Sequence, residues 1–204
     1  MEGRTAVARP VKIEDSVLLE RLSDVFREVG YEGASLAALS EAAGLQKASL
    51  YHRFPGGKEQ MAGEVMTGAE AWLTEHILTP LKSSGAPAAR IQAMIRGLNV
   101  FYAGGRQACL LNMMSSPRDD RGPFARLIKN AFNAWIDALT AVVMAAAFDE
   151  ATARFRAERA VVILQGSLVL SRGIGTTRPF RNCLANLERE LLAPAGIDGR
   201  TAGA

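Results

Sequence analysis

The chain has 204 residues, of which 49% are hydrophobic and 22% are charged, and its formal net charge is +3. This composition excludes a disordered or fibrous protein, and the length allows one domain or a small domain joined to a larger one. No apolar run approaches the roughly 18 residues that span a bilayer, and the polar start MEGRTAVARPVK does not resemble a secretion signal. We therefore expect a cytoplasmic, globular protein without a membrane partner.

Three helices are predicted in the first quarter of the chain. Apolar residues recur at helical spacing over 16–29, which predicts a helix with one buried stripe that ends at Gly30. Ser35 is a favourable N-cap because its hydroxyl can accept an orphan backbone N–H, and a short second helix follows over 36–43. Gly44 ends that second helix.

The third predicted helix runs from about Gln46 to Phe54, because the Pro-Gly-Gly that follows cannot continue it. Leu50 and Phe54 are its inward residues. Its other side chains are small, polar or cationic, and they are Lys47, Ala48, Ser49, Tyr51, His52 and Arg53. No acidic residue lies between Glu41 and Glu59. A helix face of this kind contributes nothing to a core, and it predicts a surface that meets a partner.

Helical periodicity continues to the end of the chain, and strand alternation never appears. A long fourth helix is predicted to begin near Lys58 and to stop before Pro80, and a fifth helix to begin at Pro87. The short apolar segment ACLLNMMSS comes next, and then a helix opened by Pro123 that is apolar on more than one face. The stretch ERAVVILQGSLVLSRGIG predicts a further helix, PFRNCLANLERELLAP predicts an amphipathic last one, and 195–204 is expected to be a flexible tail.

The chain has few of the residues that catalysis or metal binding requires. Its cysteines, Cys109 and Cys183, lie far apart with no CxxC or Cys/His spacing, so we predict no disulfide framework, zinc site or other cofactor. Cys109 has one cation nearby in the sequence, Arg106, and no neighbouring resolving cysteine, which disfavours a redox sensor. The two histidines, His52 and His76, have no nucleophile at motif spacing, and PGGK lacks the pattern of a phosphate-binding loop, so an enzyme is disfavoured.

The first three predicted helices form a helix-turn-helix pattern, with two short helices joined by a tight glycine turn and a longer helix before them. In such a unit the second short helix lies in the DNA major groove with its first residues at the base edges. Duplex DNA carries dense phosphate charge, so clearing acids from 45–58 favours DNA even though the net charge of the whole chain is modest. These residues therefore predict DNA binding.

The segment ASLAALSEAAGLQKASLYHRFPGGKEQM resembles the DNA-binding domain of TetR-type transcriptional repressors, whose signature tyrosine, phenylalanine and lysine are matched by Tyr51, Phe54 and Lys58. The specific resemblance covers 16–66. The Pro-Gly-Gly before the lysine and the segment ACLLNMM are similar to a subgroup that includes regulators of drug export.

The family resemblance implies a nine-helix, all-α architecture with two domains. A helix-turn-helix domain with an N-terminal arm would occupy 1–57, and a helical ligand-binding and dimerisation domain would occupy 58–194, before the tail. The last two helices, about 152–192, would form a homodimer interface. Beyond residue 66 this expectation rests on analogy of the general plan.

The resemblance also implies which residues contact DNA. It implies base or groove contacts from Gln46, Lys47, Ala48 and Ser49, and phosphate contacts from Ser35, Tyr51, His52 and Lys58. Side-chain chemistry agrees, because Lys47 can donate to guanine and Ala48 can meet a thymine methyl, whereas Tyr51 is long enough to reach a phosphate. An ordinary boundary aromatic is the alternative for Tyr51, and a bystander is the alternative for His52.

Some positions depart from the family pattern. Gln46 stands where the family more often has a capping Ser or Thr, and Ala37 replaces a longer polar residue that contacts DNA in some members. Arg53 either compensates for these changes or only solvates the helix end. The cations of the N-terminal arm either enter a minor groove or belong to an uninvolved terminus, and they are Arg4, Arg9 and Lys12.

The larger domain has the residues for a small-molecule pocket, which is usually an apolar cavity with a few convergent polar groups. The apolar candidates are Trp72, Tyr102, Met113, Met114, Phe132 and Trp135, and the candidate polar anchors are Asn112 and Gln165. An ordinary core position is the alternative for each aromatic and methionine.

Together these patterns predict a ligand-responsive repressor that binds a pseudo-palindromic, double-stranded DNA operator as a homodimer. Its effector would be a small, largely apolar molecule that releases the operator. A helical protein-interaction module and a DNA binder without a ligand are the alternatives.

Overall fold

The computed structural model describes residues 13–115 and 122–194. These residues form helices and no strand, which confirms the predicted all-α fold. The elements are α1 (Asp15–Gly33), α2 (Leu36–Ala43), α3 (Lys47–Arg53), α4 (Gly57–Leu73), the π-helical turn η1 (Thr74–Leu78), α5 (Thr79–Lys82), α6 (Pro87–Phe101), the 3-10 turn η2 (Ala103–Gly105), α7 (Leu110–Met113), α8 (Ala125–Met144), α9 (Glu150–Gly173) and α10 (Arg178–Leu192). The arm cations Arg4, Arg9 and Lys12, for which both a minor-groove contact and an uninvolved terminus are open, lie outside the described residues, as does the predicted tail at 195–204.

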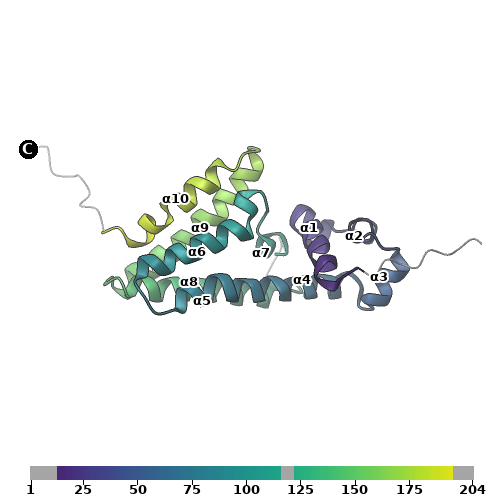
Figure 1. Cartoon of the computed structure of the whole chain (residues 1–204), viewed down its shortest axis with the longest axis horizontal. Helices are drawn as coiled ribbons and strands as arrows, with labels where there is room; N and C mark the ends of the chain where they lie inside the picture. The colour runs from purple at the N-terminus through teal and green to yellow at the C-terminus, as the bar shows by residue number, and fades with distance from the viewer. Residues whose placement is uncertain (1–12, 116–121, 195–204) are drawn as a thin grey trace, which may run out of the picture.

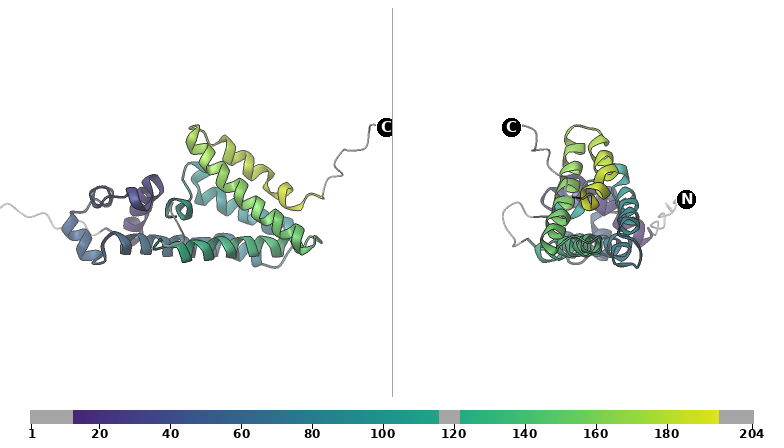
Figure 2. Two further views of the ribbon diagram at one scale, coloured as in Figure 1. Left: turned by 180° about the vertical axis from the view of Figure 1, so that it is seen from behind. Right: turned by 90° about the vertical axis from the view of Figure 1, so that its left-hand side faces the viewer.

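The molecule is elongated, and its helices fall into two groups (Figure 1). The helices α1, α2 and α3 form one end, which we call the head. The helices α6, α8, α9 and α10 pack together at the other end, which we call the body, and the views in Figure 2 agree. Because α4, η1 and α5 follow one another without a break, they form one long helix that connects the two groups. Counted in this way, and leaving the turn η2 aside, the described ranges hold the expected nine helices.

Local signals set the shape of the head. The Ser35 hydroxyl accepts the backbone N–H of Ala38 at 3.1 Å, which confirms the predicted N-cap of α2. Gly44 follows α2 in the left-handed conformation, with φ 65° and ψ 26°, as predicted. Gly30 also has a positive φ of 73°, but one more helical turn follows it, so α1 is assigned to Gly33. The predicted glycine stop is therefore a kink within α1.

The prediction that the fourth helix stops before Pro80 is wrong. The helix continues through Pro80 and ends only at Lys82. The reason is the π-helical turn η1, in which the Thr79 N–H bonds to the Thr74 carbonyl and the backbone locally widens. Such a turn lets a helix accommodate a residue that lacks an N–H.

The helix α6 packs closely against this π-helical turn. A Cβ atom added to Gly97 would lie 2.6 Å from the carbonyl oxygen of His76. That carbonyl would ordinarily accept from the residue four positions on, which is Pro80 and has no N–H to donate. Only a glycine at position 97 allows the two backbones to come this close, and the buried Ile77 adds an apolar contact beside it.

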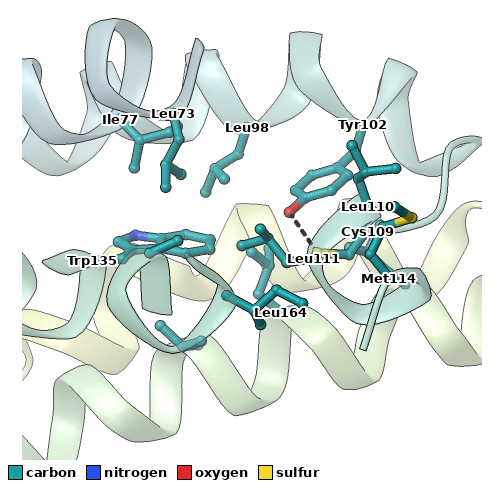
Figure 3. Packing of buried hydrophobic residues seen from close by; sticks show 14 of the residues in the cluster. Leu73, Ile77, Leu98, Tyr102, Cys109, Leu110, Leu111, Met114, Trp135 and Leu164 are labelled. Carbon is teal, nitrogen blue, oxygen red and sulfur yellow. Dashed lines mark hydrogen bonds between the residues drawn. The ribbon is translucent and has the colours of Figure 1, made fainter. Parts of the chain in front are cut away.

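The body is held together by a continuous apolar core. Trp135 of α8 is 2% exposed, and its indole N–H donates to the Met94 sulfur at 3.4 Å. In Figure 3 its ring faces Leu73, Ile77 and Leu98 from the long helix and α6. Burial of this aromatic and aliphatic surface is the main term that stabilises the body.

The helix α1 connects the head to the body, because it packs against both α4 and α7. Figure 1 shows α7 beside α1, at the junction between the two groups. A displacement of α7 would therefore also displace α1. None of the helices in 13–115 and 122–194 is both long enough and apolar enough to cross a membrane.

Candidate nucleic-acid interface and adjoining cavity

Two inward side chains position α3 in the head. Leu50 and Phe54 are 1% and 0% exposed, as predicted, and they anchor this short helix in the apolar core. The outward side chains of α3 predicted to contact DNA are all exposed, and they are Lys47, Ala48, Ser49, Tyr51 and His52. Gln46 occupies the N-cap position and is also exposed, but its side chain makes no capping bond. The helix therefore presents a row of polar and small groups to the outside.

Ser35 lies at the start of α2, where its side chain is exposed. Its hydroxyl oxygen accepts the bond from Ala38, so the O–H proton can still be donated to an anion such as a phosphate. The turn after α2 is fixed from α1, because the Arg21 guanidinium donates to the Ala43 carbonyl at 3.2 Å. The spacing of α2 and α3 is thus set by contacts within the head.

Arg53 has a role that neither sequence interpretation anticipated. Its guanidinium donates to Asp15 at the start of α1 at 3.3 Å and to Glu64 of α4 at 3.0 Å, and it lies 4.6 Å from the centroid of the Phe54 ring. The bonds to Glu64 and then to Asp15 raise the pKa of Arg53. The side chain therefore fixes the C-terminal end of α3 between two other helices, which is more than solvation of the helix end.

Lys58 is also held inside the head. Its ammonium donates to the Tyr31 carbonyl in the last turn of α1 at 2.9 Å, and it lies 4.5 Å from the centroid of the Tyr31 ring. This contact ties the end of α1 to the start of α4. An ammonium has three N–H donors, so the contact leaves donors for a second acceptor on the outer side.

A cavity of about 380 Å³ lies between α9 and the segment that leads into α7. Three of the predicted ligand residues line it, namely Asn112, Met113 and Gln165. Met114 instead lines a second cavity of about 260 Å³, which Asn112 and Met113 share and which reaches the end of α1. Both candidate polar anchors and both candidate methionines therefore lie beside cavities, and their contact with a ligand stays a prediction.

The predicted aromatic residues do not line the cavity beside α9. Trp135 and Tyr102 are each 2% exposed core residues, and Trp72 stacks on Phe101 with ring centroids 4.2 Å apart. Phe132 is half-buried against the same core. Helical periodicity selects inward residues, but it does not separate those that fill the core from those that border an empty space.

Six of the nine residues that line this cavity were not among the predicted ligand residues, and these include two on the side of α9 that carries Gln165. Leu168 and Arg172 lie three and seven positions after Gln165, on the same side of α9. This spacing is a signal that the sequence did contain. The Arg172 guanidinium donates to the Met113 sulfur at 3.2 Å and so links α9 to α7 across the cavity.

The wall of the cavity contains a buried polar pair. The Tyr102 hydroxyl donates to the Cys109 sulfur at 3.5 Å, as Figure 3 shows. Burial, followed by the neighbouring Cys109, raises the pKa of Tyr102 well above its ordinary value, so the hydroxyl stays protonated. The Gln165 amide faces this hydroxyl closely enough to oppose that rise, yet the separation is too long or poorly aligned for a hydrogen bond.

The head contacts the cavity wall directly. The buried Arg27 of α1 donates from its guanidinium to the carbonyl of Ala108, a residue that lines the cavity. It also lies 4.7 Å from the centroid of the Phe101 ring, and burial lowers its pKa. A Cβ atom on Gly30 would lie 2.9 Å from the Met113 carbonyl oxygen, so α1 and α7 touch through their backbones.

Comparisons with known proteins match both parts of the chain. The family model of bacterial regulatory proteins of the tetR family matches residues 18–65, and the model of the C-terminal domain of LmrA/YxaF-like transcriptional regulators matches residues 87–186. The HTH-type transcriptional regulator LmrA of Bacillus subtilis (strain 168) is 24% identical over 178 residues, which cover 83% of this chain and 94% of that protein.

Solved structures agree with this assignment. The TetR transcriptional regulator from Legionella pneumophila has a TM-score of 0.74 at 18% identity, covering 90% of this chain and 100% of that one. The TetR family regulator CifR, carrying cysteine substitutions and complexed with a 26 bp double-strand operator DNA, has a TM-score of 0.68 at 25% identity, covering 91% of this chain and 99% of that one. Because one family model matches the head and a second matches most of the rest of the chain, the chain belongs to the TetR family of DNA-binding transcriptional regulators.

Proposed function

We propose that this regulator is a repressor that binds a pseudo-palindromic operator as a homodimer and is released by a small, largely apolar molecule. The observation that carries the proposal is the contact between α1 and the cavity wall, because it connects a DNA-reading head to a space for a ligand. In line with the subgroup resemblance of the Pro-Gly-Gly segment, the controlled genes would include genes for drug export.

The exposed face of α3 supports the division of the DNA contacts. Lys47 and Ser49 can bond to base edges in the major groove, Gln46 is available because its amide does not cap the helix, and Ala48 can meet a thymine methyl. Phosphate contacts are assigned to Ser35, Tyr51 and His52, and to the remaining donors of Lys58. Arg53 is excluded from this set because Asp15 and Glu64 hold it.

An apolar stripe on α9 supports the homodimer through α9 and α10. Phe155, Val162 and Val169 are 63%, 68% and 60% exposed, and they recur every seven residues along one side of the helix. Exposed apolar residues in a continuous row indicate a protein partner, and a seven-residue repeat suits packing against another helix. A two-fold dimer would present two copies of α3 to successive major grooves, roughly 34 to 36 Å apart.

The same contacts support a release mechanism. A molecule that enters the cavity meets Met113 of α7 and Ala108, and these residues touch Gly30 and Arg27 of α1. A shift of α7 would therefore turn α1 and change the separation of the two copies of α3. The effect must be reciprocal, so the operator-bound protein binds the effector more weakly than the free protein does.

The test is a selection of bound sequences from a random duplex pool at one fixed salt concentration. We expect the wild type to recover an inverted repeat, Lys47→Ala to relax a base preference, and Tyr51→Ala to weaken binding to every sequence alike. Lys129→Ala, which removes an exposed lysine from α8, is the matched control and should leave the selection unchanged. No enrichment by the wild type would overturn the proposal.

A helical protein-interaction module is the second candidate, and the α9 stripe is the observation that favours it. The two candidates differ at α3, whose exposed face bears no acid. An interaction module would tolerate Lys47→Glu without loss of function, whereas a DNA reader would lose its operator because the new carboxylate repels phosphates.

A further inference from the structure

The side chain of Gln165 is the one buried polar group whose nitrogen and oxygen both lack a hydrogen-bond partner among the described residues. Buried polar groups are almost always paired, because an unpaired one loses its bonds to water without replacement. A glutamine amide needs both an acceptor for its N–H groups and a donor for its oxygen. Because Gln165 lines the cavity, a molecule bound there is in a position to supply a missing partner.

The surroundings of this amide are apolar apart from one hydroxyl. Cys109, Met113, Leu168 and Val169 form much of the cavity lining, and the Tyr102 hydroxyl lies behind Cys109. That hydroxyl donates its proton to the Cys109 sulfur, so its oxygen can face the Gln165 N–H groups as an acceptor, but the hydroxyl has no proton left for the Gln165 oxygen. The Gln165 oxygen therefore calls for a donor from a bound molecule, which a single compact group that both donates and accepts supplies.

The charges around the cavity disfavour a cation. Arg172 is the charged member of the lining, and the buried Arg27 holds the Ala108 carbonyl directly behind the wall. The acids nearby line adjoining cavities: Asp24 and Glu28 line one of about 230 Å³ together with Arg27, Arg106 and Arg172, and Glu32 lines the one of about 260 Å³. Among the described residues no acid lines the cavity itself, so the one charged side chain of its lining is the Arg172 guanidinium.

We infer that the cavity binds a neutral molecule with an apolar ring body and one donor–acceptor group, such as a phenol or a carboxamide, which pairs with the Gln165 amide. Lipophilic cations are disfavoured at this site because the one charged side chain of its lining is Arg172. The inference rests on the proposed function in taking this molecule as the effector. The volume of about 380 Å³ falls within the usual range for small-molecule sites and accommodates a body of two fused rings.

Binding of matched probes to the purified protein without DNA tests the inference. The probes are 2-naphthol and 2-naphthamide, which donate and accept, 2-methoxynaphthalene, which only accepts, and a naphthylmethyl-trimethylammonium ion. Calorimetry should show that the first two bind roughly tenfold more tightly than the ether, because the ether leaves the Gln165 oxygen unpaired. The cation should bind more weakly than all of them.

Gln165→Leu identifies the group responsible. We expect this variant to bind 2-naphthol and the ether equally, and to unfold at the same temperature as the wild type or a higher one, because the unpaired amide is gone. Asn130→Leu removes an exposed amide from α8 and should change neither property. A lower unfolding temperature for Gln165→Leu would show that the amide has a partner within the protein.

Equal binding of 2-naphthol and its ether by the wild type, no binding of either donor–acceptor probe, or tightest binding of the cation would each overturn the inference. These outcomes are independent of DNA. Failure of the operator selection with intact probe discrimination would overturn the proposed function and leave the site standing, whereas a recovered operator with no probe discrimination would overturn the inference alone.

Discussion

The head and the body both carry polar groups without a protein partner, but in opposite surroundings. On α3 the side chains of Lys47, Ser49 and Tyr51 are exposed, so water satisfies them in the free protein and DNA would replace that water in the proposed complex. In the body the Gln165 amide is buried, and nothing among the described residues satisfies it. The first arrangement costs no stability in the free protein, whereas the second costs about 1–3 kcal/mol of folding free energy, which a ligand of the proposed kind would restore.

This difference separates two kinds of substitution. Removing an exposed group from α3 should change DNA affinity and leave the free energy of unfolding as it is. Removing a buried group should change the free energy of unfolding and, through it, the response to a ligand. Individual variants should therefore change either DNA affinity or the free energy of unfolding, and a variant that changes both would break this separation.

The largest effect on the free energy of unfolding is expected within α3, where the buried Leu50 follows the exposed Ser49. Leu50→Ala should lower the free energy of unfolding by about 2–5 kcal/mol, because Leu50 is 1% exposed and its removal leaves a cavity. The neighbouring Ser49→Ala should change it by less than about 0.5 kcal/mol. Urea unfolding followed by circular dichroism measures both, and equal losses would show that the outward face of α3 is packed.

The next effect is expected at the contact between head and cavity. Arg27→Met keeps most of the side-chain volume but leaves the Ala108 carbonyl without its donor, so unfolding should become easier by about 1.5–3 kcal/mol. The variant should still bind the operator, but more 2-naphthol should be needed to release it. Operator binding measured at increasing concentrations of 2-naphthol reports this coupling. Arg126→Met, which replaces an exposed arginine, is the control. Unchanged release would show that the signal passes elsewhere.

A smaller effect is expected on the exposed face of α3, where a substitution should change the free energy of DNA binding but not that of unfolding. Lys47→Ala should lower discrimination at one base position by about 1–3 kcal/mol, because it removes donors from a base edge. Its urea midpoint should equal that of the wild type, since Lys47 is exposed. Competition between the selected operator and single-position variants measures the discrimination, and an equal loss on all sequences would assign Lys47 to a phosphate.

Sequence reasoning succeeded where the determinants are local. The helix α2 spans Leu36–Ala43 as predicted, because Ser35 caps its start and Gly44 adopts the left-handed conformation after its end. The burial of Leu50 and Phe54 followed from helical spacing alone. In each case the residues that decide the structure lie within a few positions of one another.

It failed where the deciding partner is distant in the chain. Arg53 meets Asp15 across 38 positions, and Arg27 meets Ala108 across 81 positions, so neither contact could be read from spacing. The helix stop predicted at Pro80 assumed a regular helix, and the π-helical turn before it removed that constraint. The candidate polar anchors Asn112 and Gln165 do line a cavity, whereas Trp135 and Tyr102 are core residues.

Lys58 lies at the border between the two kinds of group, and its variant gives the smallest expected effect. Lys58→Met should ease unfolding by about 1 kcal/mol, because the Tyr31 carbonyl loses its donor and the Tyr31 ring loses a cation. If its remaining donors reach a phosphate, as proposed, the slope of log affinity against log salt should also fall by about 0.9 per protomer. Lys82→Met, at the far end of the same long helix, should change neither quantity.

The structural role of Lys58 and its proposed phosphate contact can be separated, because the first changes the free energy of unfolding and the second changes the salt dependence of DNA binding. Easier unfolding with an unchanged salt slope would make Lys58 a clamp between α1 and α4, which acts on DNA only by holding α3 in place. A lower slope with unchanged unfolding would make it a phosphate contact whose bond to Tyr31 contributes nothing to stability. Both changes together would show that one ammonium, held on its inner side by a backbone carbonyl, is oriented for a phosphate on its outer side. The signature lysine would then be the point where the stability of the head and its affinity for DNA depend on the same atom.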